Sequence, residues 1–293
     1  MPDSARTAPR LPTLNLVGAG RVAQTLASLW HQQGRFAVQD VLTKSLHSAQ
    51  VACNVVGAGQ AVVQMETMRR ADIWLLGVPD AQLADCVRAL AQVAAISHTG
   101  PDDMTAPLVF HCSGAQSTAS LAPLAALGWH VASAHCILSF ASVPSAMVQF
   151  PGTPCALEGD ATACATLREA FSAIGARCFD VASGDKLLYH AAAVFATNFL
   201  PVLQATAEDL WQTTGVPADV IAHLRSALLH NAVANITALG PQAALTGPAA
   251  RGDTEAIARQ GAAVAAWDAP TGTAYEALSA LALRLAQRRP DAS

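Results

Sequence analysis

The chain has 293 residues, which is enough for about two domains that each bury a core. Its formal net charge of −4 and the lack of a basic cluster argue against a partner made of nucleic acid. The seven cysteines are scattered without a C-x-x-C pair, which favours buried thiols in a reducing cytoplasm over disulfides or zinc, and we expect no bound metal.

Two stretches bear on targeting and on membranes. Residues 1–12 contain three prolines and no apolar core, so we interpret them as a frayed leader and not as a signal peptide. The most apolar run, Leu187 to Leu203, includes His190, Asn198 and Pro201, which predicts a buried helix and not a membrane span. We therefore expect a cytoplasmic protein with no membrane partner.

The segment Leu14 to Ala27 predicts a strand, a glycine turn and a helix. Its central residues, Gly18, Ala19, Gly20, Arg21, Val22 and Ala23, form the G-x-G-x-x-A variant of the dinucleotide fingerprint. Gly18 permits the tight turn, Gly20 lets the backbone approach a pyrophosphate, and Ala23 permits close packing of the helix on the sheet. The free N–H groups of the helix then face the phosphates, although a purely structural glycine turn is the alternative.

The second strand, Phe36 to Leu42, ends in Thr43, Lys44 and Ser45. An acid at this strand end would bind the ribose hydroxyls of NAD, whereas a 2′-phosphate prefers cations and hydroxyls. The residues present favour NADP as the cofactor, with NAD possible and with a solvated turn as the alternative interpretation.

A helix over 46–56, a short strand over 61–63 and a buried parallel strand over 71–80, broken by Pro79, follow. The end of this buried strand should lie beside the first glycine turn, so we expect Gly77, Val78 and Pro79 to line the cofactor ribose. A helix over 81–95 and a loop that starts at Pro101 come next.

Two polar residues follow the next strands. Ser113 lies on the turn after a strand over 108–112, which is followed by a helix through Leu127. His135 lies near the end of a strand over 130–138. Either side chain could bind a substrate carboxylate or the nicotinamide amide, with a helix cap as the alternative for Ser113 and a core histidine as the alternative for His135. His111 and His130 are assigned to structure because no second ligand lies at metal spacing.

Two further strands, over 155–158 and 177–181, bracket a helix, and strand patterns stop after Gly184. The rest is predicted to be helical, over 185–214, 218–239, 254–267 and 272–287. The fold class is therefore α/β: an N-terminal Rossmann domain with a doubly wound parallel sheet (residues 11–182), followed by an all-α domain (residues 183–293) for substrate binding and dimerisation.

Polar residues interrupt the apolar pattern of the first long helix. Lys186, His190 and Thr197 share one face, and Asn198 lies about 80° from His190. His190 is either a structural histidine between helices or a general acid or base. In the helical half, Arg251 follows Gly247-Pro248, which stops one helix, and precedes Gly252-Asp253. Its guanidinium could bind a carboxylate or a phosphate, with an Arg–Asp pair as the alternative.

The sequence resembles a family of bacterial proteins that pair a Rossmann-like domain with an all-helical domain of unknown function, within the 6-phosphogluconate dehydrogenase-like superfamily. The resemblance rests on GAGRVA at 18–23, LLGVPD at 75–80, FHCSGA at 110–115, HCILSF at 135–140, YHAAAVFATNFL at 189–200 and LTGPAARGD at 245–253. It implies hydride transfer, a substrate site between two domains and a homodimer formed through the helical half. The Lys-x-x-x-Asn pair of several relatives is missing, because Lys186 and Asn198 are too far apart, and His135-Cys136 stands where His-Pro is expected.

The leading hypothesis is thus an NADP-dependent oxidoreductase for a small, anionic, carboxylated or imine-type substrate. His190 or Lys186 would be the acid or base, Ser113 and Asn198 would position the substrate, and Arg251 would bind its anionic group. A nucleotide-sensing or scaffold protein without catalysis is the rival, and a deazaflavin-linked reductase is a third possibility.

Overall fold

The computed structural model describes residues 10–97 and 106–288. The predicted loop at Pro101 and most of the predicted leader lie outside these ranges. The described chain packs into two compact units, the first ending at Asn198 and the second beginning at Phe199. The sequence placed the domain break at residues 182 and 183, at the point where strands give way to helices.

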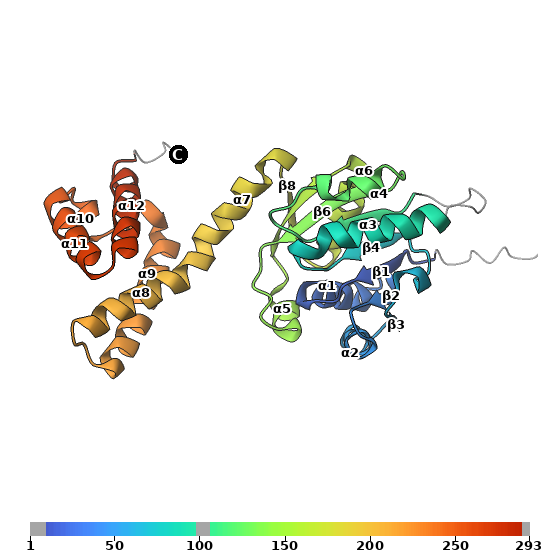
Figure 1. Cartoon of the computed structure of the whole chain (residues 1–293), viewed down its shortest axis with the longest axis horizontal. Coiled ribbons are helices and arrows are strands. Elements are labelled where there is room, and N and C mark those ends of the chain that lie inside the picture. Colours follow the sequence, from blue (N-terminus) through green and yellow to red (C-terminus); the bar gives the residue numbers. More distant parts are fainter. Residues whose placement is uncertain (1–9, 98–105, 289–293) are drawn as a thin grey trace, which may run out of the picture. The chain divides into compact units, whose positions relative to one another are not determined.

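The first unit is built on one eight-stranded sheet with the order β3-β2-β1-β4-β5-β6-β7-β8 (Figure 1). The strands are β1 Thr13–Val17, β2 Ala37–Leu42, β3 Gln60–Val62, β4 Ile73–Leu76, β5 Leu108–His111, β6 His130–Cys136, β7 Pro154–Gly159 and β8 Arg177–Asp180. Neighbouring strands are parallel except β6 and β7, which are antiparallel. The predicted α/β class with a doubly wound Rossmann sheet is confirmed, and the antiparallel pair is the departure from a fully parallel sheet.

Helices cover both faces of this sheet. They are α1 Arg21–Gln32, α2 Leu46–Val56, α3 Asp80–Ser97, α4 Ala122–Ala125, α5 Val143–Gln149 and α6 Ala161–Ala173, with short 3₁₀ turns η1 Met65–Thr67, η2 Thr118–Leu121 and η3 Ser183–Asp185. The helix expected up to Leu127 forms only as η2 and α4. Helix α5, which begins after the cap Ser142 and carries Pro144 in its first turn, lies in a segment for which no helix was expected.

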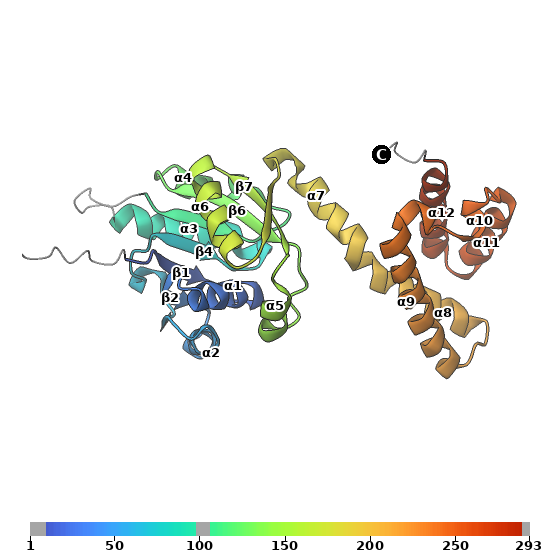
Figure 2. The same cartoon turned by 180° about the vertical axis from the view of Figure 1, so that it is seen from behind.

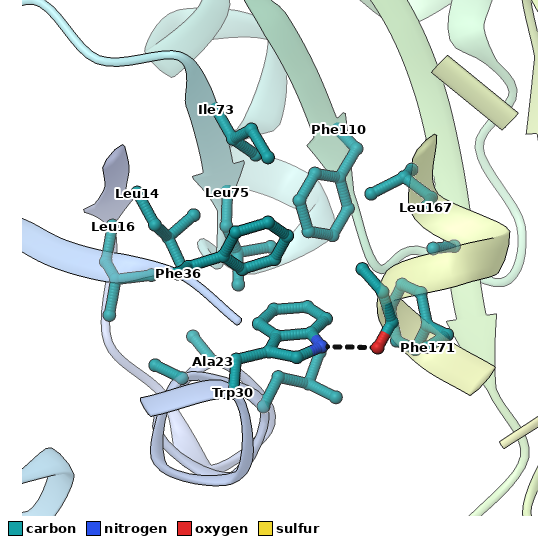
Figure 3. Close-up of a cluster of buried hydrophobic side chains, with 14 of the residues drawn as sticks. Leu14, Leu16, Ala23, Trp30, Phe36, Ile73, Leu75, Phe110, Leu167 and Phe171 are labelled. Carbon is teal, nitrogen blue, oxygen red and sulfur yellow. Dashed lines mark hydrogen bonds between the residues drawn. The ribbon is translucent and has the colours of Figure 1, made fainter. Parts of the chain in front are cut away.

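The core on one face of the sheet centres on Trp30 of α1, which is fully buried. Its ring makes edge contacts with Phe36, Phe110 and Phe171 at centroid distances of 5.3, 6.2 and 5.1 Å. Its indole N–H donates to the carbonyl oxygen of Ala170 at 2.9 Å, as Figure 3 shows. This satisfied indole joins the first helix of the chain to α6 at the far end of the sheet.

The first unit ends with helix α7 Lys186–Ala193 and a π-helical segment η4 Val194–Asn198. The second unit contains α8 Phe199–Thr213, α9 Ala218–Ala243, α10 Gly247–Ala250, α11 Thr254–Trp267 and α12 Ala269–Ala286 (Figure 2). Helix α9 is interrupted at Gly240, whose φ of 77° is not helical. Gly247-Pro248, expected to stop a helix, instead begins the short helix α10 with Pro248 in its first turn.

Helices α11 and α12 pack closely because of a glycine. A Cβ placed on Gly272 would lie 2.6 Å from both Cα and Cβ of Ala265, so a larger residue would force the two helices apart. Apart from this contact the second unit has a small core, with Ile221 as its buried large apolar side chain among the described residues.

The expectation that the run Leu187 to Leu203 is buried is wrong for the single chain. Leu187 and Leu188 are 73% and 76% exposed, and Val202 is 59% exposed. By length and composition alone, residues 183–213 would also suffice to cross a membrane. The apolar pattern of this run therefore marks an exposed apolar surface among the described residues.

Candidate active site

The glycine turn after β1 has the geometry of a dinucleotide cradle. Gly18 has a φ of 82°, and a Cβ on it would lie 2.7 Å from a methyl carbon of Val78 and 2.8 Å from the backbone of Gly77. Gly77 in turn packs so closely on Gly18 and Ala23 that a Cβ there would meet them at 2.6 and 2.7 Å. Both positions therefore require glycine, and the backbone around them is fixed.

Helix α1 begins directly after this turn. Its N-cap is Gly20, which offers no side chain to bond the first N–H groups, whereas Ser45 caps α2 and Asp160 caps α6. The N–H groups of the first turn of α1 thus remain available to an anion, as a pyrophosphate site at a helix N-terminus requires.

A cavity of about 1250 Å³ extends along the carboxyl ends of the strands from this turn. Its walls include the predicted residues Gly18, Ala19, Gly20, Arg21, Val22, Thr43, Lys44, Gly77, Val78, Pro79 and Ser113. The cavity is large enough for a dinucleotide, and the structure thus brings most of the predicted cofactor residues to one place.

Ser45 differs from its two neighbours in sequence. Thr43 and Lys44 line the cavity, but the Ser45 hydroxyl caps α2 by accepting a bond from the Ser48 N–H at 3.2 Å. Ser48, in the first turn of α2, lines the cavity where Ser45 was expected to do so. Asp40, the nearest acid on β2, is buried and accepts a 2.6 Å bond from the Arg69 N–H, so it is committed to the fold.

Arg21 lines the cavity and also organises a loop beside it. Its guanidinium donates to the carbonyl oxygen of Ala141 at 2.7 Å. Ser139, Phe140 and Ala141 of that loop are themselves part of the cavity wall. The second variable position of the fingerprint therefore holds the loop after β6 against the cradle.

Ser113 is at the opposite end of the cavity from the strand end of β2. Its hydroxyl donates to a carboxylate oxygen of Asp80 at 2.7 Å and accepts bonds from the N–H groups of Ala115 and Gln116. The bonds from these N–H groups are those expected if Ser113 acts as a cap. The same residue also lines the cavity.

Lys186 is 2% exposed and is the buried residue of helix α7. Its ammonium group donates to the carbonyl oxygen of Ser113 at 2.9 Å and to the Ser133 hydroxyl at 2.7 Å. Burial lowers its pKa, and the negative charge of Glu158 opposes that shift. Two protein acceptors hold this amine in place.

Glu158 on β7 completes this buried network. Its carboxylate accepts hydrogen bonds from the hydroxyls of Ser133, Thr118 and Ser183 and from the N–H of Thr118. Burial alone would raise the pKa of Glu158, but these hydrogen bonds outweigh it and the pKa is lowered. The carboxylate is therefore ionised, and Ser133 links it to the Lys186 ammonium.

His135 and His190 lie together over the turn after Ser113, with ring centroids 5.8 Å apart. A Cβ on Gly114 would lie 2.5 Å from Nδ1 of His190 and 2.9 Å from Nε2 of His135, so the two imidazoles approach the chain as only glycine permits. Nδ1 of His190 is buried and has no hydrogen-bond partner within the described chain. Such an atom is a reactive or ligand-binding candidate, because natural proteins satisfy nearly all buried polar groups.

Nδ1 of His135 forms a 2.8 Å hydrogen bond with the Tyr189 hydroxyl. Burial, and secondarily the charge of Lys186, lowers the pKa of His135 to about 4. Burial raises the pKa of Tyr189 to about 12. Both side chains are therefore neutral at physiological pH.

The remaining predicted site residues are not part of this cluster. Asn198 is exposed at the end of the π-helical segment, and its side-chain oxygen accepts a bond from Thr197 at 2.9 Å. Arg251 is exposed in the second unit, directly after α10. Their proposed roles stay predictions. No group of three metal-binding side chains occurs in the described ranges.

Several residues of the site escaped sequence reasoning. Asp80, Gly114 and Tyr189 lie in the motifs at 75–80, 110–115 and 189–200, but nothing in these motifs indicates which residues they contact. Glu158 offered a signal that could have been used, since a lone acid in an otherwise apolar strand must find donors.

Comparison with known proteins agrees with this architecture. Residues 2–136 match the Rossmann-like domain model, and residues 153–282 match the model of a domain of unknown function, DUF2520. No curated protein matches the chain.

Solved structures share the fold over nearly the whole chain. A Thermotoga maritima protein, TM1727, is 21% identical, with a TM-score of 0.72 over 94% of this chain and 98% of its own. A Bacteroides fragilis protein, BF3122, assigned as an NADP oxidoreductase, is 22% identical, with a TM-score of 0.68 over the same shares. A pyrroline-5-carboxylate reductase from Coxiella burnetii is 14% identical, with a TM-score of 0.55 over 95% of this chain and 100% of its own.

The glycine cradle and the sheet order define a Rossmann-type dinucleotide-binding fold. The chain thus combines a segment that matches a Rossmann-like domain with a segment that matches a DUF2520 domain, as the resemblance implied. The similar structures share this two-part fold.

Proposed function

We propose that the protein is an NADP-dependent oxidoreductase that acts on a small carbonyl or imine substrate with a carboxylate. The observation that carries the proposal is the continuous cavity that runs from Lys44, past the glycine cradle, to Ser113. A dinucleotide phosphate fits this length and these groups, because the anionic parts meet the first turn of α1 and a lysine. The oxidoreductase and the reductase among the similar structures support the same class of reaction.

The preference for NADP follows from the strand end of β2. Thr43 and Lys44 line the cavity there, and Asp40 is bound to Arg69 inside the fold. A ribose 2′-phosphate would find a cation and hydroxyls, and a ribose diol would find no free carboxylate on β2.

The Ser113 end of the cavity adjoins polar groups that could serve the reaction. When bound, the nicotinamide would supply or accept a hydride. Ser113 offers a hydroxyl fixed by Asp80, and His190 offers an unpaired nitrogen close to Gly114. We propose His190 as the group that exchanges a proton with the substrate and Lys186 as the group that holds the Ser113 turn.

Binding and turnover can be measured separately. NADPH is titrated by fluorescence into the full chain and into Gly18→Val, which cannot adopt the turn, with Gly34→Val as the control because a Cβ there meets nothing within 4 Å although its φ is also positive. NADPH oxidation is then followed with a panel of cyclic imines and 2-oxo acids. Tight binding abolished by Gly18→Val, with turnover of at least one class, is expected. Absence of NADPH binding overturns the proposal, whereas binding without turnover favours a nucleotide sensor.

We also propose that a second copy of the chain covers the exposed apolar helices. In the second unit, large apolar side chains such as Leu228, Val233, Ile236 and Leu239 are half exposed or more, and Ile221 alone among the large apolar residues described there is buried. A bundle with so little core is not stable by itself, and a homodimer interface built from these helices would supply the missing burial.

A further inference from the structure

The phenol of Tyr189 and the imidazole of His135 form a fixed pair between helix α7 and strand β6. Their hydrogen bond is 2.8 Å long, and their rings meet edge to face at 5.6 Å and 88°. The Tyr189 ring also contacts the ring of Phe179, at a centroid distance of 6.2 Å. The tyrosine is thus packed in place and its hydroxyl has a defined direction.

We propose that Tyr189 donates its hydroxyl proton to Nδ1 of His135 and thereby holds this imidazole as the Nε2–H tautomer, a neutral hydrogen-bond donor for the oxygen or nitrogen of a polarised C=O or C=N bond. The tautomer is a property of the protein alone and does not depend on any substrate. Its use toward a substrate rests on the proposed function.

The direction of the hydrogen bond follows from which of the two groups carries a proton at neutral pH. Burial raises the pKa of Tyr189 and lowers that of His135, so at neutral pH the phenol keeps its proton and the imidazole carries one. Within the described ranges, Nδ1 of His135 is the one hydrogen-bond partner of the phenol oxygen. Among the described groups of the chain, the phenol proton therefore has an acceptor only if Nδ1 is unprotonated, and the ring proton is then on Nε2.

The charges around His135 favour a neutral ring. Lys186 and His190 face it from α7 and disfavour protonation, whereas Asp80 at the start of α3 favours it more weakly. A neutral imidazole N–H can polarise a carbonyl or imine without becoming a strong acid, which suits a site where charge develops on that atom during hydride transfer.

Nε2 of His135 lies next to the cavity, although His135 is not among the residues that line it. It lies against Gly114, at the same turn that Nδ1 of His190 approaches and that carries Ser113 into the cavity. The two histidines would then have different roles. His135, with its fixed N–H donor, would bind the polarised atom, and His190, with its unpaired nitrogen, would exchange the proton. Tyr189 is a positioning residue in this arrangement, because it acts through His135.

The test is ¹⁵N NMR of the full chain labelled at histidine, at pH 7.5, in which protonated and unprotonated ring nitrogens resonate at different frequencies. The spectrum of His135→Gln identifies the His135 signals. The expected wild-type result is a single tautomer with Nε2 protonated. Tyr189→Phe should lose this single-tautomer signature and give a mixture.

Tyr275→Phe is the matched control, because Tyr275 is the second of the two tyrosines and donates to Gln260 on α11. It should leave the His135 signals unchanged. A wild-type ring protonated on Nδ1, or an unchanged tautomer in folded Tyr189→Phe, overturns the proposal. If Tyr189→Phe fails to fold, as judged by circular dichroism, the wild-type spectrum alone still decides the direction of the bond.

An NADPH titration of the same samples separates the two proposals. An Nε2–H tautomer without NADPH binding rejects the oxidoreductase function and keeps the positioning role of Tyr189. NADPH binding with an Nδ1–H tautomer rejects the positioning role of Tyr189 and leaves the oxidoreductase function in place.

Discussion

The ammonium group of Lys186 lies 2.9 Å from the carbonyl oxygen of Ser113, a residue 73 positions earlier in the chain. This bond joins the first turn of helix α7 to the turn that follows β5. Because His190 is one helical turn beyond Lys186, the bond also sets where His190 stands relative to Gly114.

Lys186→Met should therefore lower the free energy of unfolding by about 1–3 kcal/mol, because two buried acceptors lose their donor and Glu158 loses its countercharge. Urea denaturation monitored by tryptophan fluorescence measures the change. The chain has one other lysine, the exposed Lys44, and Lys44→Met should change stability by less than about 0.5 kcal/mol. Equal stability of Lys186→Met and the wild type would show that the amine does not secure the helix.

Cofactor preference is predicted to depend on Lys44. NADPH should bind more tightly than NADH, and Lys44→Ala should weaken NADPH binding by about 1–3 kcal/mol by removing a charged hydrogen bond to the 2′-phosphate. NADH binding should hardly change in the same variant. Isothermal titration of both cofactors gives the answer, and identical curves for NADPH and NADH would contradict the prediction.

His190→Gln separates a structural histidine from a reacting one. Because Nδ1 of His190 has no partner in the described chain, we expect little loss of stability and a fall of about 10²–10⁴ in turnover, the usual contribution of a general acid or base. His223→Gln, at an exposed site on α9, is the control. A lower melting temperature with turnover intact would assign His190 to structure.

Stability should depend on pH through His111. Burial lowers the pKa of this 1% exposed histidine from 6.5 to about 4. Between these values the unfolded chain binds a proton that the folded chain does not, so the free energy of unfolding falls as pH falls. One such group contributes about 2 kcal/mol between pH 7.5 and pH 5.

Urea denaturation at the two pH values measures this loss. His111→Asn, which keeps an acceptor for the Ser113 N–H, should reduce the difference by that amount, whereas His47→Asn at an exposed site on α2 should not. His135 acts in the same direction and should leave part of the dependence in place. An unchanged pH dependence in His111→Asn would refute the assignment.

The dimer prediction is tested by light scattering at micromolar concentration. We expect the mass of two chains and an interface of more than roughly 2,000 Å². Val233→Glu combined with Ile236→Glu should abolish the dimer or its solubility, because both side chains are 51% exposed on α9. Val148→Glu, at an 82% exposed valine on α5, should not. A wild-type monomer would contradict the prediction.

The sequence was sufficient for features that local patterns encode. The glycine turn at Gly18 and the apolar strands are short-range signals, and they predicted the order of most elements. Helix α5 has seven residues and no clear periodicity, so it was not predicted. The apolar run after Lys186 was expected to be buried because periodicity identifies an apolar face but not the molecule that covers it.

The site itself was predictable as a set of residues but not as a network. Lys186, His190, His135 and Ser113 were each singled out. Their contacts depend on the antiparallel pairing of β6 and β7 and on where α7 starts, which bring Tyr189 to a residue 54 positions away. Nothing local in either segment specifies that pairing.

The bond from Trp30 to Ala170 has a consequence for how the protein can evolve. Ala170 belongs to the segment matched by DUF2520, whereas Trp30 belongs to the segment matched by the Rossmann-like domain. Strands β7 and β8 likewise come from the former and complete the sheet of the latter. A recombination event between residues 137 and 152 would divide one aromatic core and leave β6 without its neighbour. In this chain the two matched segments therefore share one core, and a functional exchange of the C-terminal part would have to cross over beyond β8.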